Sequence, residues 1–91
     1  IGKYGNLHLA YLKAHRPGTY TSLLTQFRLN EYLHEIDLQA KEMLNRIMTQ
    51  MAQSRGITET MKEQDGLRWA AEMNNIRAAA EETVLHDLIY A

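Results

Sequence analysis

The spacing that comes closest to a reactive site is Glu31-x-x-His34, the half-motif of di-iron sites in helical bundles. Glu82 and His86 would lie at about the same height if the helices that carry the two pairs formed an antiparallel hairpin. Against a metal site, Glu31 and His34 project away from the apolar side of their helix, and a full set of ligands is lacking. The sequence therefore predicts no metal-binding residues.

Residues for nucleophilic catalysis are not grouped in the sequence either. Ser22 and Ser54 have no glycine-rich or elbow-like surroundings and no paired histidine. The neighbours His86 and Asp87 point about 100° apart on a helix. The chain contains no cysteine and no glycine-rich phosphate loop. We therefore expect a protein without catalytic residues, cofactor or small-molecule substrate.

The clearest chemical signal is the distribution of charge. Residues 1–30 contain no acidic residue and carry two histidines and four bases, Lys3, Lys13, Arg16 and Arg28. Residues 31–91 carry all eleven acidic residues and the other six bases, so the two parts have formal charges of +4 and −5. A basic segment that also holds tyrosines suits phosphate contacts and base stacking, and its four bases are the predicted nucleic-acid-binding residues. The alternative is a solvated surface with buried tyrosines, and four charges alone give only weak, salt-sensitive binding.

Capping and turn residues divide the chain into four expected helices and no strand. These helices cover about residues 5–16, 19–28, 31–55 and 58–89. The signals that mark their ends are the Pro17-Gly18 turn, possible N-caps at Asn30 and Thr58, and Gly56 after the third helix. Gly66 is a weak point that favours a kink in the fourth helix.

The fourth expected helix has two apolar stripes, whereas the third has one. We expect the third helix to pack antiparallel on the first stripe, which consists of Trp69, Met73, Ile76, Ala80 and Val84. The second stripe faces either the N-terminal helices or another copy of the chain. Asn74 lies in it, either setting the register of such a contact or hydrogen-bonded within one subunit. With Leu38, which points among polar residues, this stripe gives the predicted protein interface: Leu38, Leu67, Ala71, Asn74, Ala78, Leu85 and Ile89.

Length and composition favour one small helical domain over residues 1–91. The expected fold is an all-α bundle, in which the short basic helices of residues 1–30 pack on an acidic, long antiparallel hairpin of residues 31–91. No apolar run approaches the roughly 18 residues that span a bilayer, and the absence of cysteine fits the cytoplasm. The chain begins with Ile1, not Met, so we expect that an N-terminal segment of the full protein precedes it.

Several stretches resemble, in order and over nearly the whole chain, the small TnpV proteins encoded on bacterial transposons. They are residues 1–5 (IGKYG), 11–16 (YLKAHR), 20–25 (YTSLLT), 29–33 (LNEYL), 36–37 (ID), 56–59 (GITE), 73–77 (MNNIR) and 88–91 (LIYA). One departure is Gln26-Phe27-Arg28, where the family more often places a glycine-containing turn. This departure favours second and third helices that run on more continuously.

The resemblance implies a cytoplasmic accessory protein of a bacterial mobile element, and it supplies no catalytic motif to transfer. The leading hypothesis is binding to DNA, or to a DNA–protein complex, through the basic N-terminal helices. The alternative hypothesis is a helical protein-interaction module or inhibitor that acts on a host or element-encoded protein, or that forms a homodimer. Here the second stripe and Leu38 would carry the contact.

Overall fold

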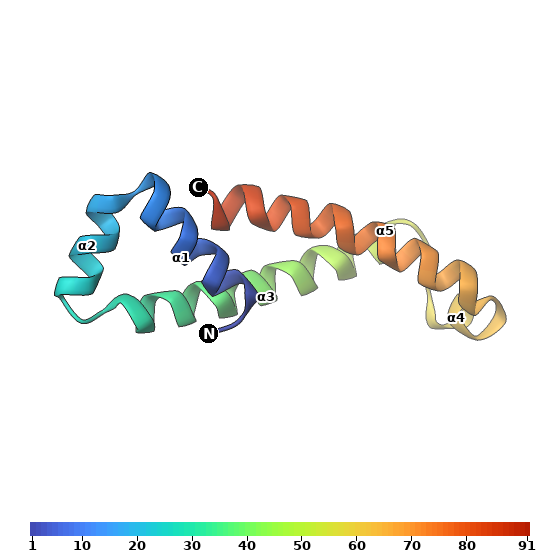
Figure 1. Cartoon of the computed structure of the whole chain (residues 1–91). Helices are drawn as coiled ribbons and strands as arrows, with labels where there is room; N and C mark the ends of the chain where they lie inside the picture. The colour runs from blue at the N-terminus through green and yellow to red at the C-terminus, as the bar shows by residue number, and fades with distance from the viewer.

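The computed structural model describes residues 1–91 and consists of helices without any strand (Figure 1). The helices are α1 (Lys3–His15), α2 (Pro17–Thr25), α3 (Leu29–Ser54), α4 (Glu59–Gln64) and α5 (Gly66–Val84), and a π-helical turn, η1 (Leu85–Ile89), continues α5. The expectation of a small all-α bundle is confirmed.

The molecule is an elongated rod with principal extents of 55 × 20 × 18 Å. Helices α3 and α5 form its antiparallel hairpin, and α1 packs against α3 and η1 at one end (Figure 1). Helix α2 lies beyond α1 at that end, whereas α4 closes the opposite end. The rod therefore has a thicker end, where α1 and α2 lie beside the hairpin, and a thinner end, where α4 packs on the start of α5.

Capping and turn residues in the sequence predicted both ends of α3 to within two residues. The helix begins at Leu29 and ends at Ser54, close to the expected 31–55. Gly56 follows it with a φ of 69°, a left-handed conformation that glycine adopts without strain. The expected N-cap at Asn30 is wrong, because this residue lies inside the first turn and Arg28 occupies the capping position.

The expected fourth helix is interrupted. Thr58 caps α4 as expected, since its Oγ1 accepts a hydrogen bond from the Met61 N–H at 3.3 Å. The chain then breaks at Asp65, whose Oδ1 accepts from the Arg68 N–H at 3.2 Å and so caps α5. An aspartate that can cap a helix, followed by a flexible glycine, favours a new helix over continuation of the old one.

The turn between α2 and α3 also differs from expectation. The two helices do not run on continuously, because Phe27 adopts a φ of 57°. The Arg28 N–H donates to the Leu23 carbonyl at 2.9 Å, and the Phe27 N–H donates to the Leu24 carbonyl at 3.1 Å. These bonds close the end of α2 and redirect the chain into α3.

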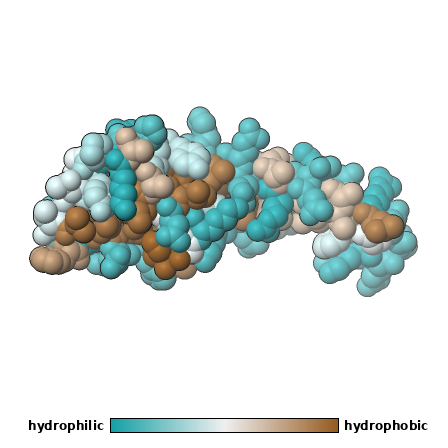
Figure 2. Space-filling model, viewed as in Figure 1, coloured by the Kyte–Doolittle hydropathy of each residue, from teal (hydrophilic) through white to brown (hydrophobic).

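The hydrophobic core lies at the thicker end, where α1, α3, α5 and η1 meet. Its buried members are Tyr4, Ile36, Ala40, Leu44, Ala80, Val84 and Ile89. The first stripe of α5 faces α3 as expected, with Ile76, Ala80 and Val84 fully buried. Figure 2 shows apolar atoms gathered over the α1–α2 end and a smaller group at the far end, where α4 and α5 meet. The core therefore depends on α1 covering the hairpin.

A buried carboxylate fixes the start of α1 against α3. Asp37 is 3 % exposed, and its Oδ1 accepts the Gly5 N–H at 2.9 Å, while Lys41 Nζ lies 2.9 Å from Oδ2. Gly2, at the N-cap, provides no side-chain cap, so Asp37 supplies the negative group that the positive end of the helix dipole favours.

Two glycines make this approach possible. A Cβ on Gly2 would lie 2.8 Å from Asp37 Oδ2, and a Cβ on Gly5 would lie 3.0 Å from the Leu33 carbonyl oxygen. The second contact is with backbone, which cannot swing away. Only a residue without a side chain lets α1 come this close to α3 at Gly5.

Asp37 makes the stability of the fold depend on pH. Its hydrogen bonds from Lys41 and from the Gly5 N–H hold the pKa of the Asp37 carboxyl below its usual value. Because the folded-state pKa is lowered, the stabilisation is fully present above about pH 5 and is lost as pH falls through the folded-state pKa. We expect Asp37→Asn to lower the free energy of unfolding at pH 7 by about 1–3 kcal/mol.

Urea denaturation between neutral and acidic pH measures this effect. The wild-type chain should lose more stability on acidification than the Asp37→Asn variant. Glu35→Gln is the matched control, because Glu35 is exposed on the same helix. Equal pH dependence of the wild type and Asp37→Asn would contradict the assignment.

Candidate nucleic-acid interface

The four predicted nucleic-acid-binding residues occupy two separate places. Lys3 lies in the first turn of α1 and Lys13 in its last turn, about 15 Å apart along the helix axis. Arg16 lies between α1 and α2, close to Lys13, and Arg28 lies between α2 and α3. Lys13 and Arg16 thus lie just before α2 and Arg28 lies just after it, and α2 is at one end of the rod (Figure 1). We call these three residues the basic end.

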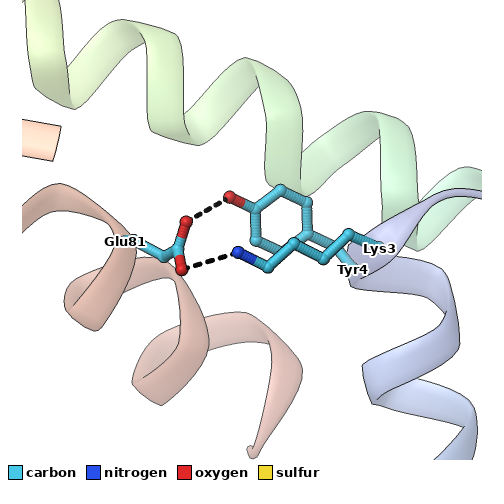
Figure 3. Close-up of polar contacts among 3 residues, drawn as sticks. All are labelled: Lys3, Tyr4 and Glu81. Carbon is cyan, nitrogen blue, oxygen red and sulfur yellow. Dashed lines mark hydrogen bonds and ion pairs between the residues drawn. The ribbon is translucent and has the colours of Figure 1, made fainter. Parts of the chain in front are cut away.

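Lys3 is engaged in a structural contact. Its Nζ lies 2.8 Å from Oε1 of Glu81 on α5, and the Tyr4 hydroxyl donates to Oε2 of the same carboxylate at 3.0 Å (Figure 3). The hydrogen bonds from Lys3 and Tyr4 hold the pKa of Glu81 below its usual value, and the hydrogen bond to Glu81 raises the pKa of Lys3. Lys3 thus connects α1 to α5, and its charge is locally balanced.

The residues of the basic end have no acidic partner. The three ion pairs of the structure are Lys3–Glu81, Lys41–Asp37 and His86–Asp87. Lys13, Arg16 and Arg28 are all exposed, and α2 between them buries none of its residues. Lys13 Nζ lies 5.5 Å from the centroid of the Tyr20 ring, a cation–π contact that connects α1 with α2. The basic end therefore presents its charge to solvent.

The turn between α1 and α2, which Pro17-Gly18 predicts in the sequence, has a simple local cause. Pro17 occupies the first position of α2, where its fixed φ suits a helix start and its missing N–H costs nothing. The chain thus ends α1 at His15 and starts α2 at once, with only Arg16 between them. This sharp corner holds Lys13 and Arg16 close together.

The two histidines of the basic segment have different roles. His8 is buried, with Nδ1 2.7 Å from the Ile89 carbonyl oxygen and Nε2 3.0 Å from the Tyr32 hydroxyl. Because a carbonyl only accepts, Nδ1 carries the hydrogen and donates it to Ile89, and Nε2 shares a hydrogen bond with the Tyr32 hydroxyl. His8 therefore joins α1 to α3 and η1. His15 is exposed, with its ring centroid 5.1 Å from that of Tyr11.

The Glu-x-x-His pair does not form part of a ligand cluster. Glu31 and His34 are exposed on α3, Glu82 is exposed on α5, and His86 is exposed on η1. The structure contains no group of three or more histidine or carboxylate side chains placed to hold a metal ion.

The predicted protein interface is divided by the fold. Ile89 is fully buried in the core, and Leu85 is half-buried beside it. The remaining members stay on the surface of the rod: Leu67 is 88 % exposed and Leu38 49 % exposed, and Ala71, Asn74 and Ala78 are exposed on one side of α5. The N-terminal helices thus cover only the C-terminal part of the second stripe. Asn74 is on the surface and not hydrogen-bonded in the interior.

Sequence reasoning missed one residue next to the basic end. Phe27 is 96 % exposed and lines a shallow hollow together with Leu24, Leu29 and Asn30. The only signal in the sequence was the unusual Gln26-Phe27-Arg28 stretch at an expected turn.

Comparison with known proteins identifies one family. The family model described as "Transposon-encoded protein TnpV" matches residues 1–89, and this match confirms the resemblance seen in the sequence. No curated protein and no solved structure matches the chain. No helix is long and apolar enough to cross a membrane.

The role assigned to His8 predicts a loss of stability when its ring nitrogens are removed. His8→Phe keeps an aromatic ring but leaves the Ile89 carbonyl and the Tyr32 hydroxyl without their partner. We expect the free energy of unfolding to fall by about 1–3 kcal/mol in urea denaturation. His15→Phe, at the exposed histidine, should change it little. If His8→Phe and His15→Phe had similar free energies of unfolding, His8 would contribute only by the size of its ring and not by its hydrogen bonds.

Proposed function

Because the chain belongs to the TnpV family of transposon-encoded proteins, we propose that it is a non-enzymatic accessory protein of a bacterial mobile element that binds DNA in the cytoplasm. The contact is made by the basic end, through Lys13, Arg16 and Arg28. Lys3 serves mainly to hold α1 on α5, because Glu81 balances its charge.

The observation that supports this proposal is the set of exposed bases without acidic partners around α2. Phosphate groups of duplex DNA attract such charges, and their neutralisation releases condensed counterions. Residues 1–30 also contain no acid, so no carboxylate of this segment repels the phosphates. Three phosphate contacts give weak binding without sequence readout, which suits a protein that acts beside a larger DNA complex.

This proposal predicts salt-dependent binding to duplex DNA. We expect the logarithm of the association constant to fall with the logarithm of salt concentration with a slope of about −3, from three phosphate contacts. Lys13→Glu combined with Arg16→Glu should weaken binding strongly and reduce the slope. Fluorescence anisotropy of a labelled duplex over a salt titration measures both quantities.

The matched control is Arg55→Glu combined with Lys62→Glu, which makes the same change in net charge toward the other end of the rod. Its affinity should stay near that of the wild type if the contact is local. Absence of any binding by the wild-type chain at the lowest salt would refute the proposal. If both double variants lost DNA affinity equally, binding would depend on the net charge of the chain and not on a local contact at the basic end.

A second candidate function, of a different class, is self-association through α5. Its exposed side carries Leu67, Ala71, Asn74 and Ala78, which no part of the chain covers. Arg68 and Glu82 lie seven residues on either side of Asn75, and all three are exposed. An antiparallel pair of α5 helices, related by a twofold axis at Asn75, therefore places each Arg68 opposite Glu82 of the other copy.

Charge substitutions on this side of α5 test the second candidate. Ala71→Lys combined with Ala78→Lys should convert a dimer to a monomer, because two like charges would then be buried in each half of the contact. Size-exclusion chromatography with light scattering gives the mass. Ala10→Lys combined with Ala14→Lys, at exposed positions of α1, is the control. A wild-type chain that stays monomeric at high concentration would exclude this candidate.

A further inference from the structure

The turn between α2 and α3 presents an aromatic ring to solvent. Phe27 is the most exposed of the large apolar side chains, at 96 %. The turn that carries it projects from the end of the rod, away from the α3–α5 hairpin (Figure 1). An apolar ring that contributes nothing to the core is a typical feature of a binding surface.

The backbone at this position is strained. Phe27 has a φ of 57° and is the one residue other than glycine with a positive φ in the chain. Glycine would adopt this conformation without the clash that a side chain brings. Folding alone would thus be served better by glycine, and strain of this kind is often kept where the side chain has a function.

The surroundings of Phe27 indicate the shape of what binds there. The hollow is lined by Leu24, Phe27 and Leu29, which are apolar, and by one residue with an amide side chain, Asn30. An apolar surface beside an aromatic ring suits the face of a flat ring system. The Asn30 amide, which is both a donor and an acceptor, suits a ring with polar groups along its edge.

The charge around the hollow indicates the rest of the ligand. Arg28 follows Phe27 directly in the sequence and is exposed, as is Glu31 after Asn30, whereas Arg16 lies at the far end of α2. A flat ring with a polar edge, attached to a negatively charged chain, is a nucleotide of a nucleic acid. An uncharged apolar protein surface would not require these arginines.

We propose that the hollow binds one unstacked base of DNA. The Phe27 ring stacks on the base, the Asn30 amide lies at its edge, and Arg28 contacts the adjoining phosphate. This inference rests on the proposed DNA binding by the basic end, and it adds a preference for DNA that has an unpaired base. A fully paired duplex keeps its bases stacked, so that no base face is free to stack on Phe27.

The test uses Phe27→Gly, a variant that should fold at least as well as the wild type because it relieves the strained φ. The probes are a duplex with one bulged 2-aminopurine and the same duplex without the bulge. We expect the wild type to prefer the bulged duplex roughly tenfold and to change its 2-aminopurine fluorescence by stacking. Phe27→Gly should lose both effects and keep the salt dependence on the paired duplex.

Tyr90→Ala is the matched control, because Tyr90 is another exposed aromatic residue and does not line the hollow. It should keep the preference for the bulged duplex. If Phe27→Gly binds both duplexes as the wild type does, the stacking role is wrong while DNA binding by the basic end stands. If the wild type binds neither duplex at low salt, the stacking role and the proposed function are both wrong.

Discussion

The contact between the Asp37 carboxylate and the start of α1 determines where the rest of the thicker end can lie. It pairs a buried negative group with the positive end of a helix dipole, and it spans 32 residues of sequence. Because Gly2 and Gly5 let the backbones meet, Tyr4 enters the core and its hydroxyl reaches Glu81. Without this contact, α3 and α5 would form a bare hairpin with one side of its core open to water.

The same docking explains how the basic segment divides into two functions. The first turns of α1 are occupied with internal partners: Lys3 with Glu81, and His8 with Tyr32 and the Ile89 carbonyl. From Lys13 onward the bases have no such partners and surround α2, which buries nothing. Part of the positive charge of residues 1–30 therefore stabilises the fold, and the rest is available to a ligand.

The sequence predicted what depends on local periodicity and capping. The bounds of α3, the left-handed Gly56, the Thr58 cap and the stripe of α5 that faces α3 all follow from neighbouring residues. It did not predict Asp37 or His8 as structural residues, because their partners lie 32 and 81 residues away. The sequence marked Gly66 as a weak point that favours a kink, but it did not predict a full break with Asp65 as a new cap, since a capping residue inside a helical pattern has an ordinary alternative as a surface residue. Of the candidate site, three bases could be named by type, but the balanced charge of Lys3 and the strained turn at Phe27 required the tertiary structure.

The bond between His8 and the Ile89 carbonyl has a consequence for the order of events during synthesis. Its two partners are 81 residues apart, so α1 cannot complete its docking until the residues through Ile89 have left the ribosome. During that interval α1 and α2 exist without Glu81, and the whole positive charge of residues 1–30 is unbalanced. Residues 1–30 thus carry a stronger uncompensated positive charge before docking than after it, and η1 is the element whose arrival closes α1 onto the core.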